Sequence, residues 1–123
     1  MCVLALLGVA WSQPQVGKTI LDYGPQLGLD DGQMGQLRTT VTTFMERSAS
    51  LKKQLKTAES VVASQTQKRL GIDKIRQSVE ASEEIRTQIR LNDVVTSRKI
   101  RTILTVQQWA QWEKIKQGAS KQS

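Results

Sequence analysis

The chain has 123 residues, with 18 lysines and arginines against 11 aspartates and glutamates, a net charge of +7, no histidine and one cysteine, Cys2. It therefore lacks the Cys–His and Ser–His pairs of nucleophilic catalysis and the ligands of common zinc sites. Met34 and Met45 offer soft sulfur ligands, but Met34 lies on an apolar stripe, where core packing explains it better. We therefore expect no enzyme, with no catalytic residue, no cofactor and no metal site.

The N-terminus carries an apolar run at residues 3–10, followed by Ala10 and Ser12 at the spacing of a signal-peptidase site. Spanning a bilayer takes about 20 apolar residues, so the run is too short to be a transmembrane helix. No lysine or arginine precedes it, so either the leader is incomplete or the true start lies upstream. A buried N-terminal strand or helix is the alternative. We expect residues 1–12 to be a signal peptide of a periplasmic protein, with no transmembrane span in the mature chain.

Beyond the leader, the sequence predicts a series of helices separated by turn residues. A short helix is expected at residues 19–23, ended by Gly24-Pro25. Asp30 and Asp31 then begin a helix of residues 31–64. Its apolar side chains recur in steps of three and four, as a helix that packs along its length requires. These side chains are Met34, Leu37, Val41, Phe44, Leu51, Leu55, Ala58 and Val62.

A polar turn around Gly71 precedes a second long helix, predicted at residues 73–103 with Asp73 as its N-cap. Its apolar positions are Ile72, Ile75, Val79, Ile85, Ile89, Val94 or Val95, Ile100 and Ile103. Thr105 is expected to cap a last helix at residues 106–117, ended by Gly118, with residues 119–123 disordered. The predicted fold is a single all-α domain, residues 13–118, in which two long helices form an antiparallel hairpin with short flanking helices.

Two short segments echo each other at the starts of the first long helix and the last helix. One contains Leu29, Asp30 and Gln33, the other Leu104, Thr105 and Gln108, so each reads Leu-Asp/Thr-x-x-Gln. The leucine can anchor the turn, Asp or Thr can cap the helix, and the glutamine can hydrogen-bond back across the cap or to the other copy. Two ordinary helix starts are the simpler explanation.

The paired motifs and their layout resemble the LTxxQ pattern of the Spy/CpxP family of periplasmic chaperones and stress adaptors, over residues 27–117. The first copy has Asp30 where the family has threonine. The lack of histidine and cysteine departs from the family's metal-sensing branch. The resemblance implies a thin, curved homodimer that binds unfolded or misfolded client proteins without ATP. The alternative is a stress or metal-response sensor or adaptor that binds a signalling protein, without a His/Cys metal site.

Basic side chains beside the apolar stripes provide candidates for a client-binding surface, because charge attracts unfolded chains and apolar area then holds them. Ordinary solvated surface charge is the simpler explanation for any one of them. The basic residues are scattered and follow no nucleic-acid-binding motif, so nucleic acid is not expected as a partner. A structural helical module remains a third alternative. The candidate client-binding residues are Arg38, Met45, Arg47, Lys52, Lys56, Arg86 and Arg90.

Overall fold

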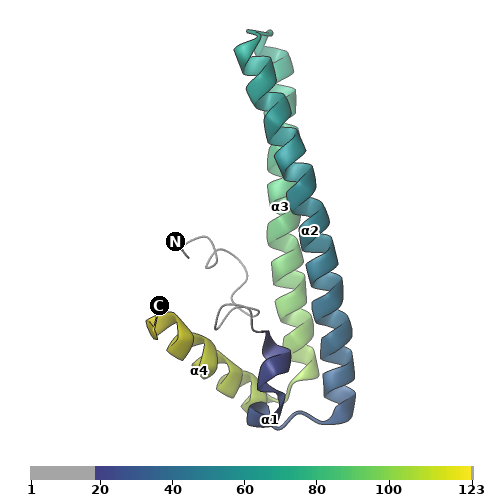
Figure 1. Ribbon diagram of the computed structural model, residues 1–123, viewed down its shortest axis with the longest axis vertical. Coiled ribbons are helices and arrows are strands. Elements are labelled where there is room, and N and C mark those ends of the chain that lie inside the picture. Colours follow the sequence, from purple (N-terminus) through teal and green to yellow (C-terminus); the bar gives the residue numbers. More distant parts are fainter. Residues whose placement is uncertain (1–18, 123) are drawn as a thin grey trace. The chain divides into compact units, whose positions relative to one another are not determined.

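The part of the chain that the structure describes is built from helices. The computed structural model describes residues 19–122, and for residues 119–122 the backbone only. The elements follow in the order η3 (Ile20–Tyr23), α1 (Gly24–Leu27), α2 (Asp31–Gln67), α3 (Ile72–Ile103) and α4 (Val106–Gln122) (Figure 1). The predicted all-α class is confirmed, whereas the predicted signal peptide, residues 1–12, lies outside the described residues.

The chain divides into two compact units. Unit 1 holds the described residues up to Thr43 and those from Asp93 onward, and unit 2 is the continuous segment Phe44–Asn92. Both α2 and α3 contribute to each unit. Unit 1 is therefore assembled from two segments that lie far apart in the sequence.

The short helix η3 ends at Tyr23 with Gly24 as its C-cap, as predicted, but the Gly24-Pro25 pair does not stop the helical path, because α1 begins at Gly24 itself. Thr19 caps η3, and its backbone N–H donates to the Asp22 carboxylate at 2.8 Å in a capping box. Pro25 occupies the first turn of α1, where its missing N–H removes no helical hydrogen bond. The chain turns instead at Gly28, whose φ of 71° favours a residue without a Cβ.

The core of unit 1 draws one or two apolar side chains from every element. Trp112 on α4 is fully buried, and its ring centroid lies 5.7 Å from that of Tyr23. α1 and α4 are in contact, so this tryptophan packs against the first elements of the chain. The buried apolar residues of unit 1 are Ile20, Leu27, Leu37, Val41, Ile100, Leu104 and Trp112.

α4 is longer than predicted. The helix passes through Gly118 and ends at Gln122, so Gly118 is not its stop and the tail that we expected to be disordered is helical over residues 119–122. Glycine costs about 1 kcal/mol relative to alanine inside a helix, which weakens a helix without ending it.

Unit 2 consists of two antiparallel helical segments joined by a turn. Hydrogen bonds link residues of α2 to residues of α3 that are progressively closer in sequence toward the turn, as antiparallel helices require. The Asn92 side chain donates to the Phe44 carbonyl at 3.3 Å, and Arg47 donates to Gln88 at 3.3 Å. Nearer the turn, the Ser78 hydroxyl donates to the Gln65 side chain at 2.6 Å.

The predicted apolar stripe holds throughout α2 but only in part on α3, where the isoleucines from Ile75 onward are buried or half-buried. All eight stripe residues of α2 are buried or half-buried. On α3, Val79 and both Val94 and Val95 are exposed, and Ile72 is 67% exposed. Small or short polar residues take the inner positions between the isoleucines of α3. These inward polar residues are Ser78, Ser82, Asn92 and Thr96.

A Schellman turn ends α2 at a residue that is not glycine. The Leu70 N–H donates to the Gln65 carbonyl and the Arg69 N–H to the Thr66 carbonyl, both at 3.1 Å. Arg69 therefore takes the left-handed position, with φ at 58°. Gly71, the predicted turn residue, caps α3 through its carbonyl, which accepts from the N–H groups of residues 74 and 75. Asp73, the predicted N-cap, lies inside the first turn of α3.

Replacing Arg69 with glycine is expected to stabilise the protein. A left-handed conformation costs a residue with a Cβ about 1–2 kcal/mol, and glycine returns about 0.4–1 kcal/mol of this through its freer unfolded state. The net gain is about 0.5–1 kcal/mol, which denaturation by urea can measure. The control is Lys68→Gly, which should destabilise, because Arg69 is the only described non-glycine residue with a positive φ. A loss of stability for Arg69→Gly would contradict the assignment of strain to this position.

Candidate functional site

The two glutamines of the paired motif meet in unit 1, 75 residues apart in the sequence. The Gln33 amide donates to the Gln108 side-chain oxygen at 2.7 Å, and the Gln108 amide donates back to Gln33 at 3.4 Å. The same Gln33 amide reaches the Ile103 carbonyl at 3.1 Å. The Gln108 amide reaches the carbonyls of Leu27 and Gly28 at 3.3 and 3.1 Å. These bonds join the starts of α2 and α4 to the ends of α3 and α1.

Each glutamine also closes a capping box at the start of its own helix. The Gln33 N–H donates to the Asp30 carboxylate at 2.7 Å, and its side-chain oxygen accepts from the Asp30 N–H at 3.0 Å. Thr105 and Gln108 repeat both bonds at 3.1 and 2.9 Å. The predicted hydrogen bonding of the motif, both across its caps and between its copies, is confirmed. The motif is a structural clasp, because each glutamine bonds only to backbone groups, to its own capping residue and to the other glutamine.

A second cluster in unit 1 brings cations onto aromatic rings. The Lys116 Nζ lies 5.2 Å from the ring centroid of Trp109 and 5.8 Å from that of Trp112, and the Arg101 guanidinium lies 5.6 Å from Trp109. Burial lowers the pKa of Lys116, while the carboxylates of Glu113 and Asp93 partly oppose this change. The cluster fastens α4 to the end of α3, and its lysine is held by the rings.

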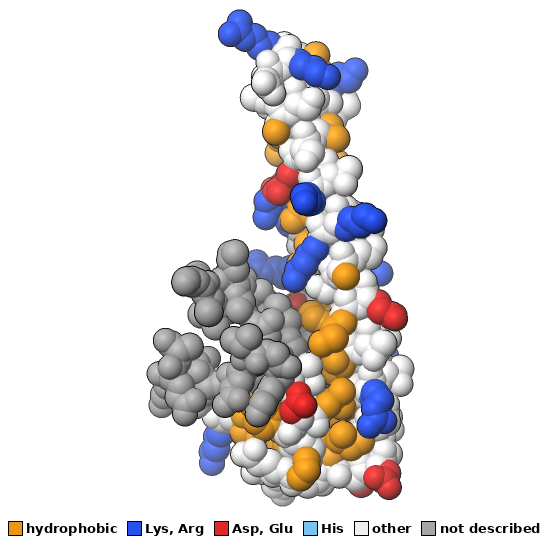
Figure 2. Space-filling model, in the orientation of Figure 1, with side chains coloured by type: hydrophobic (Ala, Val, Ile, Leu, Met, Phe, Trp, Pro, Cys, Tyr) orange, Lys and Arg blue, Asp and Glu red, His pale blue; other side chains and the backbone are white. Residues whose placement is uncertain are grey.

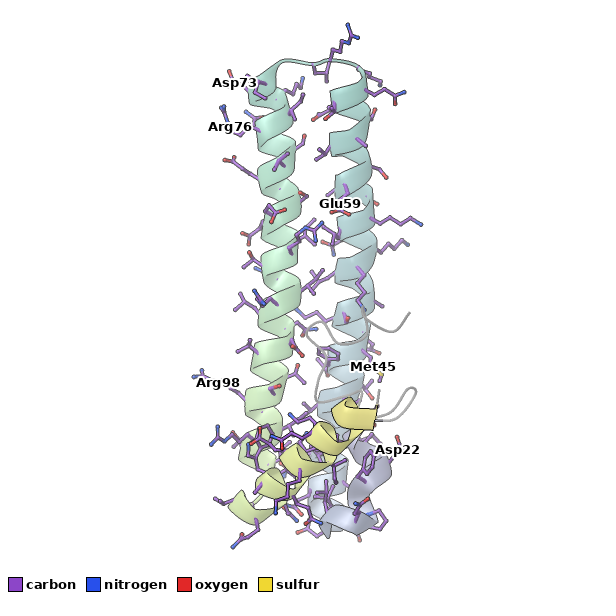
Figure 3. The ribbon with its side chains drawn as sticks, turned by 90° about the vertical axis from the view of Figure 1, so that its left-hand side faces the viewer. Asp22, Met45, Glu59, Asp73, Arg76 and Arg98 are labelled. Atoms are coloured by element: carbon purple, nitrogen blue, oxygen red, sulfur yellow. The ribbon has the colours of Figure 1, made fainter. Side chains whose placement is uncertain are left out.

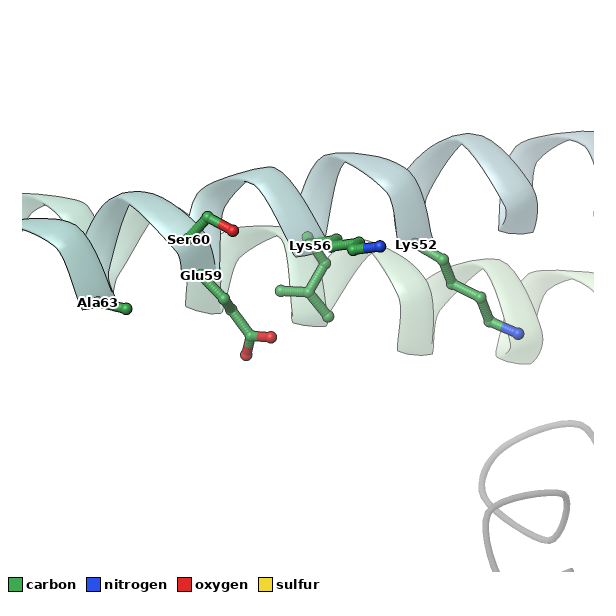
Figure 4. A pocket seen from close by; sticks show the side chains of 6 residues that line it. Lys52, Lys56, Glu59, Ser60 and Ala63 are labelled. Atoms are coloured by element: carbon green, nitrogen blue, oxygen red, sulfur yellow. The ribbon is translucent and has the colours of Figure 1, made fainter.

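Unit 2 carries an open groove along one face of α2 (Figure 4). Its volume is about 400 Å³. Leu55, a half-buried stripe residue, forms its apolar floor between Lys52 and Lys56. Glu59 lies one turn further on and pairs with Arg86 of α3. The residues that line the groove are Lys52, Leu55, Lys56, Glu59, Ser60 and Ala63.

The predicted client-binding residues differ in their partners and in the unit to which they belong. Lys52 and Lys56 share the groove, and among the described residues neither has a carboxylate partner. Arg86 is paired with Glu59 and Glu83, and Arg47 donates to Gln88. Arg38 is exposed and belongs to unit 1.

The remaining two candidates, Met45 and Arg90, are both exposed in unit 2 (Figure 3 labels Met45). Met45 is 47% exposed, which leaves apolar area in solvent. Arg38, Met45 and Lys52 all lie on α2, but Arg38 belongs to unit 1 and the other two belong to unit 2. The better-defined candidate is the groove around Lys52 and Lys56, because there the charges are unpaired and lie beside an apolar floor.

Sequence reasoning missed three residues that shape these features. Glu59 was not predicted to face Arg86, because the register between two helices cannot be read from either one alone. Ser60 and Ala63 of the groove have no distinctive pattern. The signal that could have found them is the helical spacing, since Glu59 and Ser60 lie three and four positions beyond Lys56, and Ala63 lies seven positions beyond it on the same face.

The comparisons with known proteins give no relative. No family model matches the sequence, and no curated protein or solved structure is significantly similar to it. Within residues 19–122, no helix is long and apolar enough to cross a membrane. The same residues contain no group of three or more carboxylate, imidazole or thiol side chains placed to hold a metal ion.

Proposed function

We propose that the protein is an exported, ATP-independent chaperone-like protein that binds unfolded or stress-exposed proteins through unit 2. The observation that carries this proposal is an excess of exposed over buried apolar residues. In unit 2, Phe44 and Leu51 are the only large apolar side chains that are buried, and others are at most half-buried. Six others are exposed to solvent. They are Met45, Val61, Leu70, Ile72, Val79 and Leu91.

Charge in unit 2 favours the same function. Residues 44–92 hold ten basic and six acidic side chains, a net charge of +4. Figure 2 shows lysine and arginine side chains interspersed with apolar ones on the visible face of this segment. A surface of this kind attracts an acidic, unfolded chain over a distance of about 10 Å and then holds it weakly by apolar contact. The resemblance to the Spy/CpxP family supports the proposal, and it rests on the paired motif.

A homodimer belongs to the proposal. Exposed apolar residues along a two-helix segment are commonly covered by a second copy, which also creates a longer client surface. Sedimentation at increasing protein concentration measures the oligomeric state directly. A protein that stays monomeric at all concentrations would contradict the homodimer, and client binding would then have to occur on a single chain.

Reversing two charges in the groove is expected to weaken client binding. The assay dilutes a chemically denatured acidic protein into buffer without ATP and follows light scattering with and without the full chain. Wild type should suppress aggregation at near-equal molar ratio, and added salt should weaken the suppression. Lys52→Glu with Lys56→Glu should require about tenfold more protein, since each reversal costs about 1 kcal/mol or less at an exposed site.

The matched control reverses Lys53 and Lys99, which are exposed and lie outside the groove. It changes the net charge by the same amount, so it should behave like wild type. Equal loss in both double variants would show that net charge acts without the groove. No suppression by folded wild type, together with tight binding to one defined partner, would favour the signalling adaptor instead.

A further inference from the structure

The turn between α2 and α3 places apolar and basic side chains together at one end of unit 2. The Schellman turn at Arg69 exposes two aliphatic residues, Leu70 at 38% and Ile72 at 67%. Figure 2 shows lysine and arginine side chains beside apolar ones at this end. We call this surface the basic tip, and it consists of Lys68, Arg69, Leu70, Ile72 and Lys74.

The exposure of Ile72 is not required by the fold. Leu70 and Ile75 occupy the positions of a hydrophobic staple around the start of α3, which accounts for the partial burial of Leu70. Ile72 is the first residue of α3 and has no such role. A β-branched side chain at this position gives the helix no advantage over a polar one. Its exposed area is available to a partner.

The charges around Ile72 are free to meet an anionic partner. Among the described residues, Lys68, Arg69 and Lys74 have no carboxylate within ion-pair distance. Arg76 donates to the Asp73 carboxylate at 2.9 Å, so the one acid at this end is neutralised (Figure 3). The tip therefore presents three uncompensated positive charges around two aliphatic side chains.

We propose that the basic tip docks the protein on an anionic phospholipid surface. Lys68, Arg69 and Lys74 would contact lipid phosphates, while Ile72 and Leu70 enter the boundary between headgroups and acyl chains. Amphipathic segments bind membrane interfaces by this combination of basic and aliphatic side chains. The site is separate from the groove at Lys52 and Lys56 and does not depend on client binding.

Other occupants fit the tip less well. Two aliphatic side chains offer far less area than the roughly 800 Å² per partner of a stable protein interface. A second copy of the tip would bring three positive charges against three. Single-stranded nucleic acid is held by aromatic side chains that stack on bases, and the tip, residues 68–74, has none. A membrane needs only charge and a shallow aliphatic contact.

Vesicle sedimentation with the full chain tests the proposal. One set of vesicles contains equal parts phosphatidylglycerol and phosphatidylcholine, and the other contains phosphatidylcholine alone. The first tip variant combines Lys68→Gln, Arg69→Gly and Lys74→Gln, and the second is Ile72→Gln. The apolar run at residues 3–10 is common to all variants, so the readout is the ratio of their partition constants.

Each lost charge should lower binding to the anionic vesicles about fivefold, so the triple variant should lose about a hundredfold. Ile72→Gln should lose about tenfold. The charge control is the triple variant Lys53→Gln, Arg98→Gln and Lys99→Gln, which removes the same charge from exposed helical positions. The apolar control is Val106→Gln, because Val106 is also the first residue of a helix and is 85% exposed.

The proposal is supported if both tip variants lose binding to the anionic vesicles and both controls retain it. It is overturned if the charge control falls as far as the tip triple, because general charge would then explain the binding. Unchanged partition of the tip variants would also overturn it. So would loss of client protection in the tip variants without any change in vesicle binding, since the tip would then be a protein contact.

Discussion

Replacing Trp112 with alanine is expected to unfold unit 1 or bring it close to unfolding. The indole is fully buried and contacts the Tyr23 ring. Removing a buried tryptophan costs about 3–5 kcal/mol through lost burial and the cavity that remains. A small domain has about 5–15 kcal/mol of stability in total, so this loss is a large part of it. Urea denaturation followed by circular dichroism measures the change in the free energy of unfolding.

Two further variants separate the effects of burial and polarity. Trp109→Ala removes the same side chain from a half-buried position on the same helix and should cost less than half as much. Trp112→Phe keeps a ring and removes an indole N–H that is buried without a hydrogen-bond partner among the described residues. The gain from losing that N–H offsets lost volume, so the change should be below about 1 kcal/mol. Equal losses for the two alanine variants would contradict the central position of Trp112.

The clasp formed by Gln33 and Gln108 should give the second large effect. Gln33→Ala removes a capping bond, a bond to the Ile103 carbonyl and the bond to Gln108, and it leaves the Gln108 amide partly unpaired. Net hydrogen bonds contribute about 0.5–1.5 kcal/mol each, so the expected loss is about 2–3 kcal/mol. Gln36→Ala, at an exposed position one turn further along α2, is the matched control and should cost under about 0.5 kcal/mol.

A double-mutant cycle with Gln108→Ala isolates the contact between the two side chains. The coupling energy should be about 1–2 kcal/mol, because the residues share one hydrogen-bond network. Gln33→Glu adds a second distinction, since a carboxylate can still accept from the Asp30 N–H but cannot donate to Gln108. If Gln33→Glu were as stable as wild type, the helix cap alone would explain the motif.

The sequence predicted α2 well because its apolar residues leave no competing stripe. Leu37, Val41, Phe44 and Leu51 are buried where their spacing placed them. The glutamine clasp was also predictable, because its capping residues and glutamines carry a local pattern that appears twice. The predicted end of the short helix at Gly24 was right, whereas the predicted end of the last helix at Gly118 was wrong, because glycine weakens a helix without ending it.

The inner face of α3 could not be predicted from polarity. Ser82 is buried while Val79, three residues earlier, is exposed. The Ser82 hydroxyl donates to the Val79 carbonyl at 2.8 Å, so a polar group is satisfied within its own helix and needs no water. The isoleucines therefore decide which face of α3 turns inward, and Val79 is exposed because it lies outside that face. The groove could not be predicted either, because it includes Glu59, whose pairing with Arg86 depends on the register between α2 and α3.

The discontinuity of unit 1 determines the order in which the chain can fold. Unit 2 is one uninterrupted segment, Phe44–Asn92, whose contacts are local along the chain near its turn. Unit 1 needs Gln33 to meet Gln108 across 75 positions, with Trp112 arriving later still. During synthesis, unit 2 can form while α4 is still inside the ribosome, whereas unit 1 must wait for the end of the chain. Until then the apolar side chains of the first segment of unit 1 lack their partners in the second segment. The last residues to be synthesised therefore complete the packing of the first.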